Sequence, residues 1–142
     1  MARPSTSDTI AESLRAHREI AAAYVFGSVA SGRTRNGSDV DVAVLLGRPL
    51  SRPRTLDYRL QLMAELGSAL RRTDVDVVIL NDAPPLLAHR VLSKGRLVLQ
   101  RSASARVRFQ VQTAGRYSDL IPMFETHIRY LKRKVQQGRI VG

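Results

Sequence analysis

Two aspartates separated by one residue, Asp39 and Asp41, stand at the start of the apolar run "VAVLL". Successive side chains of a strand point to opposite faces, so we expect both carboxylates on one face and Val40 and Val42 on the other. Two like charges on one face repel each other unless a cation lies between them. Mg²⁺ takes oxygen ligands and keeps part of its shell for water or phosphate. The pair therefore predicts a platform for a metal ion and a phosphate group.

A second pair of acids, Asp74 and Asp76, opens the apolar run "DVDVVIL". Two metal ions held about 4 Å apart for phosphoryl or nucleotidyl transfer need a third carboxylate. Asp74 lies at the entrance of this run, where an acid is unremarkable. Asp76 is enclosed by Val75 and Val77, and a buried carboxylate is costly unless a metal or hydrogen bonds compensate for it. We therefore expect Asp76 to complete the metal site.

The dipeptide Gly27-Ser28 directly follows the apolar run "IAAAYVF". A glycine at this position lets the backbone approach a ligand closely. A helix starting after it would offer free N–H groups to phosphate, and the Ser28 hydroxyl is a further donor. Taken alone, Gly-Ser after a strand is also an ordinary turn.

The segment between Ser28 and Asp39 carries two arginines, Arg33 and Arg35. Either can add positive charge to a phosphate site, or simply lie on the surface. The stretch "GSVASGRT" also has the spacing of a P-loop, with Arg33 in place of the lysine. We reject a P-loop because the Asn36-Gly37 turn ends any helix within two residues of Thr34.

Around these acids the chain alternates strand and helix patterns. Four apolar runs predict strands at 20–26, 41–47, 74–80 and 96–100. Helical patterns are expected from an N-cap at Ser7 to His17, from Thr55 onward, at 84–95, and beyond residue 100. The helix that starts at Thr55 carries an apolar stripe of Leu56, Leu60, Met63, Leu66 and Leu70. We expect that last region to break near Ser118–Pro122, where Ser118 or Asp119 caps a final helix carrying Ile128, Leu131 and Val135.

Composition narrows the class of protein. The chain has 142 residues, 44% of them apolar, which indicates one globular domain. It has no cysteine, which excludes disulfides, thiolate zinc sites and cysteine nucleophiles. No apolar run approaches the roughly 18 residues needed to span a bilayer. We expect a cytoplasmic protein without membrane contact. Its histidines, His17, His89 and His127, fit no catalytic pattern.

Positive charge is concentrated at the C-terminal end. The formal net charge is +11, and residues 101–142 hold nine Lys or Arg against two acids. Such a segment favours a polyanion or an acidic partner, although a solvated arginine-rich surface gives the same composition. We expect it to dock a more acidic helical partner through Ile128, Leu131 and Val135, while contact with RNA stays open.

Gly27-Ser28, ten residues, Asp39-x-Asp41 and a later lone acid resemble the nucleotidyltransferase fold of the DNA polymerase beta superfamily. The short length resembles its minimal nucleotidyltransferases, the MNT-domain antitoxins found beside HEPN-domain toxins, and "RFQVQTAGRYSDL" is similar to the C-terminal region of that group. The resemblance implies an α/β (α+β) fold with a small mixed sheet of about four strands flanked by helices. Residues 1–100 would form the minimal nucleotidyltransferase domain, and 101–142 a basic helical extension within the same compact unit.

The resemblance also implies roles for individual residues. Gly27 and Ser28 would bind the nucleotide triphosphate, and we expect Arg33 to bind the nucleotide beside them. Asp39, Asp41 and Asp76 would bind two Mg²⁺ ions. Asp76 would also help to deprotonate the acceptor hydroxyl. The activity implied is transfer of AMP from ATP to a hydroxyl, expected to be that of a tyrosine, on a partner HEPN ribonuclease.

Two other functional classes remain open. One is a small-molecule nucleotidyltransferase, although about 40 residues after Gln100 scarcely provide the acceptor domain of such enzymes. The other is a non-catalytic antitoxin that neutralises its partner by occlusion alone. Polymerase or tRNA-end-adding activity is disfavoured because 142 residues leave no room for the further domains it needs.

Overall fold

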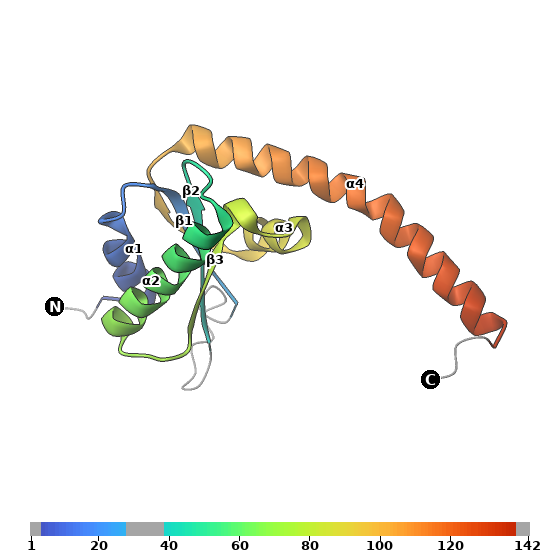
Figure 1. Cartoon of the computed structure of the whole chain (residues 1–142), viewed down its shortest axis with the longest axis horizontal. Helices are drawn as coiled ribbons and strands as arrows, with labels where there is room; N and C mark the ends of the chain where they lie inside the picture. Colours follow the sequence, from blue (N-terminus) through green and yellow to red (C-terminus); the bar gives the residue numbers. More distant parts are fainter. Residues whose placement is uncertain (1–3, 28–38, 139–142) are drawn as a thin grey trace.

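The computed structural model describes residues 4–27 and 39–138 (Figure 1). Its centre is a four-stranded sheet of β1 (Ile20–Phe26), β2 (Val40–Leu46), β3 (Val75–Ile79) and β4 (Arg96–Gln100) in the order β3-β2-β1-β4. β2 and β3 are parallel, whereas β1 is antiparallel to both β2 and β4. The expected small mixed sheet is confirmed. β2 and β3 begin one residue after Asp39 and Asp74, so these two acids lie at the strand entrances.

In the described ranges, four helices and one short 3₁₀ turn, η1 (Leu80–Asp82), surround the sheet. α1 (Thr6–Arg15) and α2 (Arg52–Leu70) cover one face, and α3 (Pro85–Lys94) and the first part of α4 (Ala103–Gln136) cover the other. No helix in the described part of the chain is both long and apolar enough to cross a bilayer.

The strands bury different side chains on their two faces. The core under α1 and α2 contains Val40, Val42 and Val44, as the alternation of β2 predicts. The core under α3 and α4 contains Ala43 and Leu45. Because Asp41 has the same parity as Ala43, its carboxylate belongs to the face that α3 and α4 cover.

Helix α1 begins two residues earlier than predicted. Its N-cap is Ser5, whose hydroxyl accepts from the Asp8 N–H at 3.1 Å while the Asp8 carboxylate accepts from the Ser5 N–H at 3.3 Å. Ser7, the predicted cap, is instead buried, and its hydroxyl accepts from Arg96 at 2.6 Å. Both serines have capping chemistry, and the acid three residues after Ser5 completes the reciprocal pair.

The leucine stripe predicted for α2 is partly wrong. Leu62 and Leu66 are fully buried, whereas Leu56 and Leu60 are each 52% exposed. The helix also begins at Arg52, three residues before Thr55. Leu56 and Leu60 form one row at helical spacing, and Leu62 and Leu66 form another. Docking on the sheet buries only the second row.

The predicted break near Pro122 is also wrong. α4 runs unbroken from Ala103 to Gln136 with Pro122 inside it, and curves along its length in Figure 1. Proline removes one N–H donor and its ring crowds the preceding turn. On this exposed part of the helix the affected carbonyl can turn to water, so a bend replaces a break.

Candidate active site

Asp41 and Asp76 are neighbours because of the strand register. In the parallel pair β2–β3, Asp41 is aligned with Asp76, and in the antiparallel pair β1–β2, Phe26 is aligned with Asp41. Gly27, the residue after Phe26, therefore lies beside the same carboxylate. Gly27, Asp41 and Asp76 are far apart in the sequence but meet at one end of the strands.

Glycine is the only residue type that fits position 27 without backbone strain. Its φ is +73°, a conformation that other residues rarely adopt, and a Cβ there would lie 2.6 Å from Asp41 Oδ2. Glycine thus leaves room for the Asp41 carboxylate. The approach of a ligand to the Gly27 backbone stays a prediction, and Ser28, Arg33 and Arg35 lie outside the described residues.

The environment of Asp41 opposes its ionisation. Burial is the main factor that raises its pKa, and the negative charges of Asp76 and Asp39 raise it further. A bound cation would remove this penalty. The Asp41 carboxylate therefore lies in the negative field of both Asp76 and Asp39.

Asp76 is held by an arginine that sequence analysis overlooked. Arg59 of α2 donates from Nη2 to Asp76 Oδ1 at 2.9 Å and from Nε to the Val77 carbonyl at 2.6 Å. The Val77 N–H also donates to Oδ1, at 3.0 Å. Asp76 Oδ2 has no hydrogen-bond partner among the residues described. Arg59 thus fixes the carboxylate by one oxygen and leaves the other for a ligand.

Asp74 is engaged elsewhere. Arg72 donates to both of its oxygens, at 2.7 and 2.6 Å, and this pairing lowers the pKa of Asp74. Arg72 thus occupies both oxygens of Asp74, whereas Arg59 occupies one oxygen of Asp76. The roles of Asp39, Asp41 and Asp76 as metal ligands stay predictions, because no group of three or more His, Asp or Glu in the described ranges is arranged to hold an ion.

A cleft of about 920 Å³ opens in front of Asp41. Its lining combines the ends of β1 and β2 with residues of α3 and α4: Phe26, Gly27, Asp41, Leu86, Leu87, His89, Arg90, Ser93, Lys94 and Tyr117. Sequence analysis missed the helical half of this lining. The usable signal was the pair Arg90 and Lys94, four residues apart in a predicted helix and so on one face. Nothing local in the sequence indicated Arg59.

Replacing Gly27 by alanine tests the close approach. We expect Gly27→Ala to lower the free energy of unfolding by about 1–2 kcal/mol, because the new Cβ adopts a left-handed conformation and displaces the Asp41 carboxylate. Urea denaturation measures the loss. Gly115→Ala is the matched control, since a Cβ there has nothing within 4 Å and alanine favours the helix. Equal unfolding free energies for Gly27→Ala and wild type would contradict the assignment.

Neutralising Asp41 tests the charge repulsion. Folding raises the pKa of Asp41 above its ordinary value of 3.8. The protein therefore loses stability as the pH rises through the folded-state pKa and the carboxylate ionises. It recovers this stability when the pH falls below the unfolded-state pKa. Asp41→Asn should therefore melt at a higher temperature than wild type at pH 7 in EDTA, and the gain should shrink towards pH 4. Asp74→Asn should show no such gain, because Arg72 stabilises that carboxylate. A lower melting temperature for Asp41→Asn at pH 7 would refute the repulsion.

Comparisons with known proteins find a matching family model and a related adenylyltransferase. Residues 8–104 match the family model described as polymerase beta, nucleotidyltransferase. The chain is 34% identical over 99 residues to the protein adenylyltransferase MntA of Shewanella oneidensis, a match that covers 68% of this chain and 66% of that protein.

Two solved structures have the same fold. A crystal structure of a toxin–antitoxin with AMP-PNP gives a TM-score of 0.74 at 28% identity, covering 89% of this chain and 98% of the other. A tri-AMPylated Shewanella oneidensis HEPN toxin in complex with its MNT antitoxin gives 0.69 at 26% identity, covering 89% and 96%. The expected fold is confirmed. The chain is a homologue of a protein adenylyltransferase, and it belongs to the polymerase beta nucleotidyltransferase family, in which it resembles the MntA antitoxin of HEPN/MNT toxin–antitoxin systems.

Proposed function

We propose that this chain is an antitoxin that transfers AMP from ATP to a hydroxyl, expected to be that of a tyrosine, on a HEPN-type toxin. The observation that carries the proposal is the register that aligns Asp41 with Asp76 beside Gly27. Support also comes from the relatives: one is a protein adenylyltransferase, and another structure contains an AMPylated HEPN toxin.

In the proposed reaction the toxin hydroxyl oxygen attacks the α-phosphorus of ATP. The bond from that phosphorus to the bridging oxygen breaks, and pyrophosphate leaves with the bond's electron pair. Asp76 Oδ2 accepts the hydroxyl proton and passes it to water, while Arg59 keeps the carboxylate oriented. Gly27 lets the phosphate chain approach the backbone.

Mg²⁺ fits the donors at this site, because carboxylate oxygens are its preferred protein ligands and Asp41 is destabilised without a cation. Asp39, Asp41 and Asp76 would hold it. When bound, it would neutralise charge on the α-phosphoryl oxygens and the leaving group.

The second half of α4 offers a docking surface for the toxin. Five apolar residues alternate at spacings of three and four, and each is 39–62% exposed: Ile121, Phe124, Ile128, Leu131 and Val135. This is the heptad seam that packs against another helix. We call it the α4 seam. In Figure 1 this half of α4 extends away from the sheet, so the domain itself leaves the seam uncovered.

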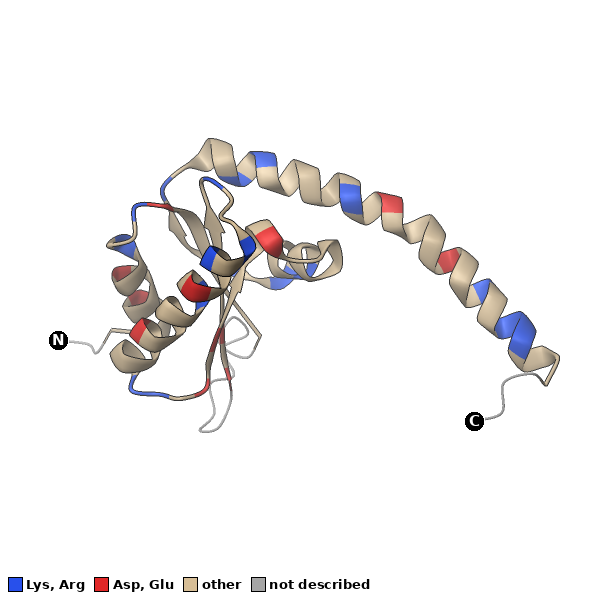
Figure 2. Ribbon diagram, in the orientation of Figure 1, with Lys and Arg blue, Asp and Glu red and all other residues tan. Residues whose placement is uncertain are grey.

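Basic residues accompany the α4 seam. Arg129, Lys132, Arg133 and Lys134 give this half of the helix a positive charge, visible near its end in Figure 2. The apolar seam would set the dissociation rate of a helical toxin, and the charges would steer an acidic one during association. A small-molecule acceptor is less well served, because among the described residues α4 is the only element after β4.

Transfer of label tests the function directly. With ATP labelled at the α-phosphate and Mg²⁺, the wild-type chain should label a HEPN protein encoded by a neighbouring gene, and mass spectrometry should locate AMP on a tyrosine. Asp41→Asn and Asp76→Asn should reduce labelling about 100-fold or more, because charge stabilisation in the transition state is lost. Asp74→Asn should retain most activity. Neutralisation of the toxin without label would favour occlusion, and label only in a small molecule would favour the other enzyme class.

Charge reversal tests the docking surface. Lys132→Glu/Arg133→Glu should slow association with the toxin several-fold at low salt. The difference should shrink near 0.5 M salt, where the Debye length is about 4 Å. Arg48→Glu/Arg54→Glu makes the same change in net charge on exposed residues outside α4 and should have a smaller effect. Surface plasmon resonance measures both. Tight RNA binding with a steep salt dependence, and no affinity for the toxin, would refute this surface.

A further inference from the structure

The cleft in front of Asp41 has one acidic wall and one basic wall. Asp41 and Gly27 lie on the sheet side, whereas Arg90 and Lys94 lie on α3. The two cations are one helical turn apart, so their side chains leave the same face of α3. The cleft thus spans from the proposed metal site to a pair of positive charges.

Neither cation of this pair is neutralised by a residue that the structure describes. Within the described part of the chain, Arg90 and Lys94 have no ion-pair or hydrogen-bond partner, unlike Arg59 and Arg72, which bind Asp76 and Asp74. Both cations are exposed at the cleft. Two unpaired cations facing a carboxylate suit a polyanion that is held by metal at one end and by N–H donors along its length.

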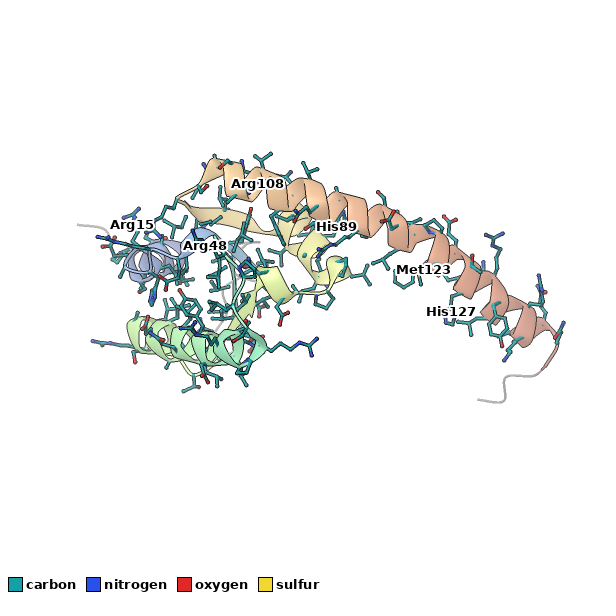
Figure 3. All side chains as sticks on the ribbon, turned by 45° about the horizontal axis from the view of Figure 1, so that its top comes forward. Arg15, Arg48, His89, Arg108, Met123 and His127 are labelled. Atoms are coloured by element: carbon teal, nitrogen blue, oxygen red, sulfur yellow. The ribbon has the colours of Figure 1, made fainter. Side chains whose placement is uncertain are left out.

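An aromatic pair lies in the same cleft. The rings of His89 on α3 and Tyr117 on α4 are stacked, with centroids 3.6 Å apart and planes 3° from parallel. Figure 3 labels His89 on the part of α3 beneath α4. Both side chains are partly exposed, so an outer ring face can receive another flat ring, as aromatic side chains do for nucleic-acid bases.

We propose that Arg90 and Lys94 bind the phosphate chain of the nucleotide, and that the His89–Tyr117 pair stacks its base. This inference rests on the proposed nucleotidyl transfer and assigns the residues that determine nucleotide affinity. The phosphates lie between Gly27 and α3, and the base lies farther out, where α3 meets α4. The proposed site thereby uses four residues of α3 and α4 that form no ion pair within the described ranges.

Calorimetry with two probes separates the contributions. AMP-PNP with Mg²⁺ reports phosphates and base together, and inorganic tripolyphosphate with Mg²⁺ reports phosphates alone. Arg90→Gln and Lys94→Met should each weaken both probes about tenfold, the loss expected for one charge-assisted contact. Tyr117→Ala should weaken AMP-PNP about tenfold and leave tripolyphosphate unchanged, whereas Tyr117→Phe should retain the affinity because its ring remains.

Arg108→Gln and Lys132→Met are matched controls, since they remove the same charges from exposed positions of α4 outside the cleft. Thermal melts verify that each variant folds. If wild type binds both probes and the Arg90 and Lys94 variants bind as the controls do, the phosphate assignment is overturned while the proposed function stands. Equal AMP-PNP affinity for Tyr117→Ala and wild type overturns the base assignment. If wild type binds neither probe, the proposed function fails as well.

Discussion

The site depends on the register of β2 between its two neighbours. Asp41 lies opposite Asp76 on one side and opposite Phe26 on the other, next to Gly27. A slip of one residue in either pairing would turn Asp41 into the apolar core, because the side chains of a strand alternate. Val40, Val42 and Val44 are completely buried on the opposite face and hold the register against such a slip. Apolar burial thus maintains a pair of carboxylates that repel each other.

The other end of β2 is also fixed. The Asn81 side chain donates to the Leu46 carbonyl at 2.9 Å and accepts from the Leu46 N–H at 2.8 Å. These two bonds satisfy backbone groups where the strand pairing ends. They also tie η1, and hence the start of α3, to the sheet. The position of Arg90 and Lys94 across from Asp41 therefore depends on a link at the far end of β2.

Arginines near the acids have separate functions. Arg59 and Arg72 are engaged with Asp76 and Asp74, so they orient carboxylates and contribute little charge to an incoming anion. Arg90 and Lys94 have no such partner among the described residues, so their charges stay available to an anion. The net charge of +11 consequently says less about the site than the pairing of individual side chains does. α4 shows a similar division, because Phe109 packs against the core while the α4 seam remains exposed.

The sequence by itself determined the strands, the alternation that places Asp41 on the opposite face of β2 from Val40, Val42 and Val44, and the glycine that follows β1. These depend on short-range periodicity and on the conformational freedom of Gly27, which neighbouring residues reveal. It did not determine which leucine row of α2 is buried, whether Pro122 ends a helix, or that Arg59 binds Asp76. Only the tertiary structure decided these, because each depends on what packs against a side chain from a distant part of the chain. The helical wall of the cleft belongs to the same class: Arg90 and Tyr117 face Asp41 only once α3 and α4 are docked on the sheet.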